Sequence, residues 1–323
     1  MNDANYRHFN YLENMDKLLS WRFRLSYKSV IKSTLKPIVK PIINLFIKED
    51  VYRDLQWKIR FYKEMNKWPS LTKPQYFNEK VMWRIKFDQN YIYTKLADKF
   101  LVRDYIGKKI GFNYLVPLRY SFDSDCEISE NHDFSNSVIK ANHGAGMVKI
   151  IDGNNYNVSE IINDCSNWMK IDFSITMNEP HYKKIKRKIL VEESLCINGI
   201  PPNDYKFHTF KSSDGSFNQV LQLVNGRFGS ESRGYYLNGI EKSDLVWSHG
   251  VGEHLIPENH RAGLLNAMEL SKVLCEDFNY VRVDWYVTDS NIFFGELTFT
   301  PGAADSYEFG KELERKMCDF WEL

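Results

Sequence analysis

Several common sequence signals are missing from this chain of 323 residues. Its five cysteines are scattered and form no CxxC pair, which argues against a disulfide framework and against a structural zinc site. The first residues show no basic start followed by an apolar run, so we expect no signal peptide and a cytoplasmic location. The longest apolar stretch, Pro41–Ile47, is far shorter than the roughly 20 residues that a membrane-spanning helix needs.

An excess of charge of one sign is also missing. The 43 basic and 42 acidic side chains leave a formal net charge of +1, so we expect no nucleic-acid partner. Residues 28–48 are locally basic, with lysines between apolar residues at helical spacing. Such a segment either packs on the protein's own core or makes peripheral contact with the inner face of a membrane. A second basic run, residues 183–188, is either a solvated face or a surface that attracts an acidic polysaccharide.

Helix-like and strand-like patterns follow one another along the rest of the chain. We predict helices where apolar residues recur every three or four positions, and strands where they alternate or form short runs. The predicted helices lie within residues 77–105, 161–168 and 264–273. The predicted strands cover residues 137–141 and 188–195, two runs within 204–225, and a hairpin at 279–299. This mixture predicts an α+β architecture.

The last predicted hairpin carries the most chemical information. Its first strand alternates apolar residues with Arg282 and Asp284, and its second strand places Glu296 and Thr298 on one face. A turn centred near Ser290 would put Asp284 opposite Glu296 or one step from it. Two carboxylates at that spacing repel each other unless a cation or a shared proton offsets the charge, and hard oxygen ligands favour magnesium or calcium. The alternative is an exposed polar face in which the register keeps the two apart.

Small residues follow the predicted strand at 137–141. The segment HGAGM, residues 143–147, would let backbone N–H groups approach a phosphate, and Lys140 precedes it inside a short apolar strand. The segment lacks the third glycine of a dinucleotide-binding fingerprint and the GKS or GKT ending of a P-loop, which disfavours those two nucleotide folds. The alternative interpretation is an ordinary hairpin turn.

The order of several motifs resembles the TupA-like ATP-grasp family, whose members occur in bacterial surface-polysaccharide synthesis. The similarity runs from about Phe77 to the C-terminus. It is carried by FNEKVMWRIKF, KLADKFLVRDYIG, VIKANHGAGMVKI, ILVEESL, NDYKFHTF and the pair RVDWY and GELTFTPGA. The chain departs from many ATP-grasp ligases at Thr298, where they carry asparagine, although a threonine hydroxyl can also ligate magnesium.

This resemblance implies an ATP-grasp fold, in which two α+β subdomains sandwich ATP. We therefore expect three parts: a helical, basic N-terminal region at residues 1–70, an N-terminal part with the ATP-grasp lid at 71–190, and a C-terminal ATP-grasp subdomain with the metal-binding hairpin at 191–323. The expected cofactors are ATP and Mg²⁺.

The resemblance also implies roles for single residues. Lys99 and Lys140 match the two lysines that reach the phosphates of ATP. The residues of the phosphate loop would be His143, Gly144, Ala145 and Gly146. The residues that bind adenine and ribose would be Glu192, Glu193, Leu195 and Asp204. The metal ligands would be Asp284, Glu296 and Thr298. Arg282 would stabilise transition-state oxygens, and Lys206 would meet phosphate or the acceptor.

The implied reaction is that of an ATP-dependent carboxylate–amine ligase that works through an acyl phosphate. The implied substrates are a uronic acid of a capsule or O-antigen glycan, which would be amidated, and an amine or amino acid. A glycosyltransferase that uses a sugar nucleotide is the alternative, with Asp123 and Asp125 as a DxD metal motif. A third hypothesis is a non-catalytic member that binds nucleotide only.

Overall fold

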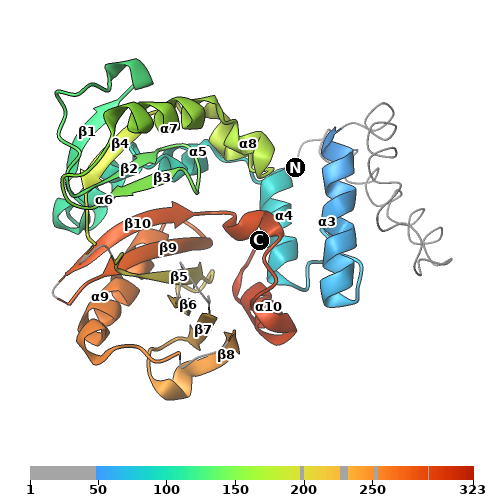
Figure 1. The fold of residues 1–323 in the computed structure, drawn as a ribbon. Helices are drawn as coiled ribbons and strands as arrows, with labels where there is room; N and C mark the ends of the chain where they lie inside the picture. Colours follow the sequence, from blue (N-terminus) through green and yellow to red (C-terminus); the bar gives the residue numbers. More distant parts are fainter. Residues whose placement is uncertain (1–48, 197–199, 226–231, 251–253, 290) are drawn as a thin grey trace. The chain divides into compact units, whose positions relative to one another are not determined.

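The computed structural model describes residues 49–196, 200–225, 232–250, 254–289 and 291–323 (Figure 1). The chain divides into two compact units, Met1–Ile59 and Arg60–Leu323, and the first described helix, α3 (Glu49–Met65), spans their boundary. The predicted membrane-contact segment, residues 28–48, lies outside the described residues. The three-part division of the chain stays a prediction. No described helix is both long and apolar enough to cross a membrane.

The first sheet of the second unit is built from short antiparallel strands. They are β1 (Leu118–Phe122), β2 (Ser137–Ala141), β3 (Val148–Ile151) and β4 (Ile189–Glu193), in the order β1-β4-β2-β3. Helix α7 (Val158–Lys170) packs on this sheet, because Ile161 and Cys165 on one side of the helix are buried against Ile139 and Val191. Helix α8 (Phe173–Thr176) follows it in the chain (Figure 1). We call this part, residues 118–193, the lid.

The second sheet is larger, and its described strands are also antiparallel. They are β5 (Asn203–Lys211), β6 (Phe217–Asn225), β7 (Ser232–Leu237), β8 (Leu245–His249), β9 (Tyr280–Val287) and β10 (Ile292–Thr298), in the order β10-β9-β5-β6-β7-β8. Helix α9 (Glu258–Cys275) covers one face, where Leu264 and Leu274 join a core with Tyr205 and Trp285. The sheet's central residues are apolar on this face and polar on the other, which leaves the polar face for a site.

Arg84 holds together the helices at one end of the polar face. It lies on α4 (Phe77–Phe87) and is almost completely buried. Its guanidinium donates to the carbonyl oxygens of Tyr280, at 2.9 Å, and Phe299, at 3.2 Å, and lies 4.3 Å from the ring centroid of Trp321. Trp321 follows the last helix, α10 (Gly310–Phe320). One side chain therefore ties α4, the end of α10 and both strands of the β9–β10 hairpin together.

Two sequence predictions about helices and strands need correction. Residues 77–105 do not form continuous helix; they form α4, α5 (Tyr91–Ala97) and the start of α6 (Val102–Lys109). The first break occurs where the Asn90 side chain accepts the backbone N–H of Ile92 and so caps α5. The second occurs at Asp98, whose side chain accepts the backbone N–H groups of Phe100 and Leu101 in the turn before α6. Strands β1, β3, β7 and β8 were not predicted. The α+β class is confirmed. The short 3₁₀ helices are η1 (Phe112–Tyr114), η2 (Asp125–Glu127), η3 (Pro180–Lys184), η4 (Lys242–Asp244) and η5 (Pro301–Ala304).

Candidate active site

The β9–β10 hairpin places two carboxylates side by side. Asp284 and Glu296 are directly paired in the antiparallel register, as one of the two predicted registers requires. A bulge lies between Phe294 and Glu296, at Gly295. Ile292 and Phe294 before the bulge face the core, and so do Leu297 and Phe299 after it. The bulge therefore shifts the alternation by one residue and turns Glu296 and Thr298 to the polar face beside Asp284.

Replacing Gly295 by alanine should disturb this arrangement. A Cβ at position 295 would lie 3.0 Å from the backbone oxygen of Asp284, so the bulge must widen. We expect a loss of about 1–3 kcal/mol in the free energy of unfolding. Chemical denaturation measures this loss. Alanine at Gly153, where a Cβ would meet open space but where φ is +69°, separates a backbone effect from the steric one. An unchanged Gly295→Ala variant would contradict the steric account.

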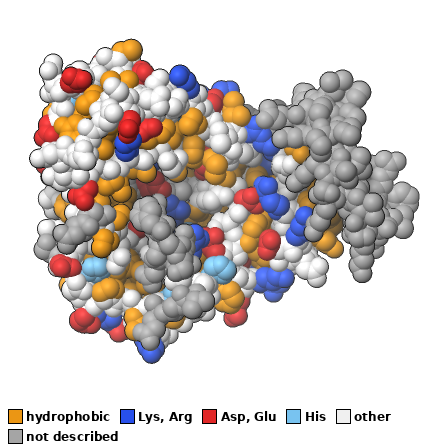
Figure 2. Space-filling view, in the orientation of Figure 1, with side chains coloured by type: hydrophobic (Ala, Val, Ile, Leu, Met, Phe, Trp, Pro, Cys, Tyr) orange, Lys and Arg blue, Asp and Glu red, His pale blue; other side chains and the backbone are white. Residues whose placement is uncertain are grey.

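Basic side chains converge on the carboxylates from several strands. Arg282 Nε lies 2.6 Å from Asp284 Oδ1, and Arg282 Nη2 lies 2.9 Å from Glu296 Oε1. Lys206, on β5, is 2.6 Å from Asp284 Oδ2 and 2.6 Å from Asp204 Oδ2. Asp204, Lys206 and Arg282 line an open pocket, and Figure 2 shows acidic and basic side chains gathered in a hollow of the molecule. The site therefore holds a compact, alternating set of charges rather than a row of like charges.

A further cation comes from the segment between α5 and α6. Lys99 Nζ donates to the carbonyl oxygen of Gly144, at 2.7 Å, and lies 3.4 Å from Glu296 Oε2. It therefore connects the loop between β2 and β3 with the β9–β10 hairpin. Lys140 on β2 is paired with Glu192 on β4 at 2.6 Å, and Arg103 on α6 lies 3.0 Å from the other oxygen of Glu192. Contacts thus hold both lysines that were predicted to reach phosphate: Lys99 with Gly144 and Glu296, and Lys140 with Glu192.

Charge and burial set the protonation of the carboxylates. Burial favours a higher pKa for Glu296, but the charges of Lys99, Arg282 and Lys206 outweigh it and hold the pKa well below the ordinary value. Burial raises the pKa of Asp284, against the opposing charges of Arg282 and Lys206. Glu296 is thus an ionised oxygen donor at neutral pH, and Asp284 shares its oxygens with two cations that a bound metal would have to replace.

The donor set fits a hard cation. Asp284 and Glu296 supply carboxylate oxygens, and the Thr298 hydroxyl lies 3.0 Å from Glu296 Oε1. Within the described residues, no group of three or more His, Cys, Asp or Glu side chains is arranged to hold a metal. Magnesium commonly takes one or two carboxylates and completes its shell with water and phosphate oxygens, so two carboxylates are enough where a nucleotide supplies the rest.

The loop after β2 is a hairpin turn, the alternative interpretation of the sequence, and its contact with phosphate stays a prediction. Residues 142–147 join the antiparallel strands β2 and β3, so the segment is a hairpin connection. At Gly144 a Cβ would lie 2.6 Å from the Phe173 ring, whereas Ala145 and Gly146 are exposed. The His143 ring is buried, with Nε2 3.2 Å from the Trp168 carbonyl oxygen, and burial lowers its pKa. Only the backbone of this loop is therefore available to a phosphate.

The residues expected to contact adenine and ribose are less closely gathered. Glu192 directs its carboxylate to Lys140 and Arg103 rather than to open space. Glu193 is exposed at the end of β4, and Leu195 follows the strand. Asp204 is buried and paired with Lys206. Of the predicted site residues, the structure thus brings together Lys99, Asp204, Lys206, Arg282, Asp284, Glu296 and Thr298, and places Glu193 and Leu195 at the end of β4.

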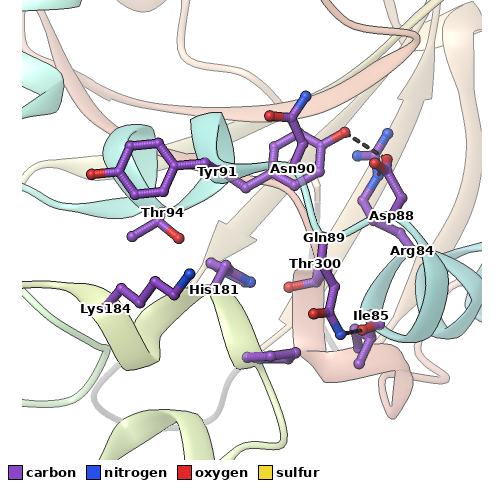
Figure 3. Close-up of a pocket in the computed structure, with 12 residues that line it drawn as sticks. Arg84, Ile85, Asp88, Gln89, Asn90, Tyr91, Thr94, His181, Lys184 and Thr300 are labelled. Carbon is purple, nitrogen blue, oxygen red and sulfur yellow. Dashed lines mark hydrogen bonds and ion pairs between the residues drawn. The ribbon is translucent and has the colours of Figure 1, made fainter.

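Three side chains near the site gave no clear sequence signal. Arg233 on β7 is paired with Glu308 in the β10–α10 loop. Glu179, in the lid, accepts a hydrogen bond from the Thr300 hydroxyl, two residues beyond Thr298. Thr300 also lines a small pocket of about 90 Å³, where His181 and Lys184 of η3 lie across from Tyr91 and Thr94 of α5 (Figure 3). Each contact joins residues far apart in the chain, which no local pattern predicts.

The stability of the fold should depend on the protonation of Glu179. Burial raises the pKa of this carboxyl from 4.5 to about 7, so the folded state holds the proton more tightly than the unfolded state does. The stabilising contribution is complete below pH 4.5 and is lost as the pH rises through 7. Glu179→Gln should therefore raise the thermal midpoint relative to wild type at pH 8 more than at pH 5. A difference that does not change with pH would contradict this assignment.

Comparison with known proteins identifies the family. The family model of the TupA-like ATP-grasp proteins matches residues 79–321, three quarters of the chain. The chain belongs to the TupA-like ATP-grasp family. No curated protein sequence matches it. The ATP-grasp match covers the lid, both sheets and α10, so the site described above lies wholly within it.

Several solved structures are weakly similar to this TupA-like ATP-grasp protein. The D-alanine–D-alanine ligase of Helicobacter pylori has a TM-score of 0.43 and 14% identity, over 71% of this chain and 61% of the ligase. D-alanyl-alanine synthetase A of Vibrio cholerae has a TM-score of 0.39 and 11% identity, over 70% and 63%. The Bacillus anthracis D-alanine–D-alanine ligase complexed with ATP has a TM-score of 0.35 and 16% identity, over 71% and 65%. The chain thus spans less than two thirds of the length of these ligases.

Proposed function

We propose that this protein is an ATP-dependent carboxylate–amine ligase. The observation that carries the proposal is the convergence of Lys99, Lys206 and Arg282 on the paired carboxylates of Asp284 and Glu296. Phosphoryl transfer needs little covalent help from a protein; it needs charge neutralisation and positioning of the phosphates. A site that alternates cations with carboxylates supplies both.

The proposed reaction has two steps. An oxygen of the carboxylate substrate forms a bond to the γ-phosphorus of ATP as the bond to the β-phosphate oxygen breaks, and ADP leaves. The amine nitrogen then bonds to the acyl carbon, phosphate leaves with the C–O bond electrons, and the nitrogen loses a proton. Lys99 and Lys140 would bind the nucleotide phosphates, while Arg282 and Lys206 would stabilise charge on the transferred phosphoryl group and the acyl oxygen. Magnesium, bound by Asp284, Glu296 and Thr298, would neutralise the β- and γ-phosphates.

The proposed substrates follow from the family rather than from single residues of the site. The family is associated with surface-polysaccharide synthesis, and we propose a uronic acid of a capsule or O-antigen glycan as the carboxylate, with an amino acid or another amine as acceptor. The proposed location is the cytoplasm, with residues 28–48 as a contact with the inner face of the membrane.

The glycosyltransferase alternative has less support in the geometry of its own motif. Asp123, the first aspartate of the DxD sequence, lies 2.9 Å from Lys186 and 2.7 Å from Lys188. The charge of Asp123 is therefore balanced by two lysines of the basic run at 183–188, and no bound sugar nucleotide or metal is needed to explain its position. Lys188 also lies 4.8 Å from the ring centroid of Phe100, so its position is fixed by packing as well as by charge.

Calorimetry with a non-hydrolysable ATP analogue tests the proposal first. The purified protein is titrated with the analogue, with and without magnesium, beside a panel of sugar nucleotides. Magnesium-dependent binding of the ATP analogue alone supports the ligase and justifies a screen of uronic acids and amines for ADP release. Binding of a sugar nucleotide in its place would favour the glycosyltransferase. Binding of the analogue without ADP release for any acceptor pair would favour a non-catalytic, nucleotide-binding member.

A further inference from the structure

A second binding region adjoins the charged cluster on the polar face of the large sheet. It is an open pocket of about 490 Å³. Its floor consists of side chains from four strands, β5, β6, β7 and β9, and its wall is the loop between β10 and α10. Lys206 and Arg282 lie at one end of this floor, and Arg233 of β7 belongs to its other side. A volume of this size accommodates a small polar molecule next to the reacting phosphate.

The loop that forms the wall has an unusual backbone. Gly302, Ala303 and Ala304 follow one another with φ values of 60°, 51° and 63°. Left-handed conformation costs an alanine roughly 1–2 kcal/mol, so contacts must hold the loop in place. Trp247 on β8 donates to the Glu308 carbonyl oxygen at 2.8 Å, and its ring occupies the space that a side chain at Gly310 would need. A strained loop held against a pocket is a common feature of binding sites.

Cations mark both ends of this pocket. Arg233 lies on β7, two strands from Lys206 on β5, which separates their backbones by roughly 10 Å. Gln222 of β6 lies between them on the floor. The basic groups are therefore divided into a reacting end, with Lys206 and Arg282, and a distant end, with Arg233.

Among the carboxylates that line the pocket, Asp204 is buried and paired with Lys206. Water reaches the other two ion pairs: Asp305 and Arg60 are 31% and 51% exposed, and Glu308 and Arg233 are 23% and 26% exposed. An ion pair that water reaches contributes little stability, so a carboxylate from solution can replace Glu308 at low cost.

We propose that the pocket binds the acceptor amine as an amino acid, with Arg233 as the residue that selects it. This inference rests on the proposed ligase function. The amino acid's own carboxylate replaces Glu308 on Arg233 and is not consumed. Its amino group points to the end of the floor where Lys206, Arg282 and Asp204 lie. The acceptor is therefore an amino acid rather than a simple amine.

The test compares amino acids with their carboxamides, which keep the amine and lose the acid. Glycine, L- and D-alanine, L-glutamate and L-lysine are each titrated against the full chain with magnesium and the ATP analogue, by saturation-transfer NMR and calorimetry. We expect at least one amino acid to bind, and its α-carboxamide to bind at least about tenfold more weakly, as for the loss of a charge-assisted hydrogen bond. D-glucuronate, which has a carboxylate but no amine, is titrated separately in the same way.

Two variants separate recognition from structure. Arg233→Gln should remove the preference for the free acid, whereas Glu308→Gln should keep or strengthen it, because Glu308 competes for the same guanidinium. If the ion pair between Arg233 and Glu308 had only a structural role, the two variants would show the same preference between amino acid and carboxamide. Thermal unfolding and ATP-analogue affinity are measured for both variants.

Several results would overturn the inference. They are no binding of any amino acid, equal binding of acid and carboxamide, an unchanged preference in Arg233→Gln, or glucuronate binding that depends on Arg233 in the absence of amino-acid binding. ATP-analogue binding without amino-acid binding would defeat this inference alone, whereas failure of the analogue to bind wild-type protein would defeat the proposed ligase function.

Discussion

The Asp284→Asn variant should lose magnesium-dependent turnover on the order of 1000-fold. Asp284 lies opposite Glu296 in the hairpin register and accepts hydrogen bonds from both Arg282 and Lys206. An amide in its place cannot neutralise a divalent cation, and it leaves the two basic side chains with less compensating charge. Glu296→Gln should have a similar effect, because it removes the negative charge that is paired with Lys99 and Arg282.

This loss is measured as ADP release at saturating magnesium, with circular dichroism to show that each variant is folded. Asp123→Asn is the matched control, because Asp123 is paired with Lys186 and Lys188 away from the hairpin. We expect the control to keep full turnover. Wild-type rates in both hairpin variants would remove the hairpin from the catalytic site, and loss of activity in Asp123→Asn would revive the DxD motif.

The Arg84→Ala variant should lose about 3–5 kcal/mol of unfolding free energy. Arg84 is 1% exposed, and its guanidinium serves the carbonyl oxygens of Tyr280 and Phe299 while lying over the Trp321 ring. Truncation leaves these two carbonyl groups without that donor and opens a cavity among aromatic rings. A loss of this size is a large part of the stability of an ordinary domain.

Urea denaturation measures this effect, and Lys95→Ala provides the comparison. Lys95 is exposed on the neighbouring helix α5, and we expect its replacement to change the free energy of unfolding by less than about 0.5 kcal/mol. Arg84→Met, which keeps some of the volume but not the hydrogen bonds, should fall between the two. A cost below about 1 kcal/mol for Arg84→Ala would show that water or a neighbouring donor replaces the guanidinium.

Much of the hairpin could be predicted because its information is local. Alternating residues in the first strand, a polar turn and a carboxylate twelve residues beyond Asp284 sufficed to place the two acids together. The bulge at Gly295 was not predicted, although it is what reconciles the core positions of Phe294 and Leu297 with the outward direction of Glu296. A glycine between an aromatic residue and a glutamate indicates flexibility only; the close approach of the Asp284 backbone is a tertiary property.

The residues missed by sequence reasoning are those joined by distant contacts. Glu179 and Thr300 are separated by 121 positions, and Arg233 and Glu308 meet only when β7 and the β10–α10 loop are both in place. Helix breaks were missed for a different reason. Apolar residues keep a helical spacing from 77 to 105, but Asn90 caps a new helix through the backbone N–H of Ile92, and Asp98 holds a turn through the backbone N–H groups of Phe100 and Leu101.

The position of Lys99 links two binding events. Its ammonium group bridges the Gly144 carbonyl of the lid and the carboxylate of Glu296. Under the proposed function, a nucleotide phosphate that drew Lys99 to itself would uncover an oxygen on Glu296, and a metal bound at Glu296 would displace Lys99 toward phosphate. The affinities for nucleotide and for magnesium would then rise together, each by the same factor, since the two effects are one free energy of coupling measured from either side.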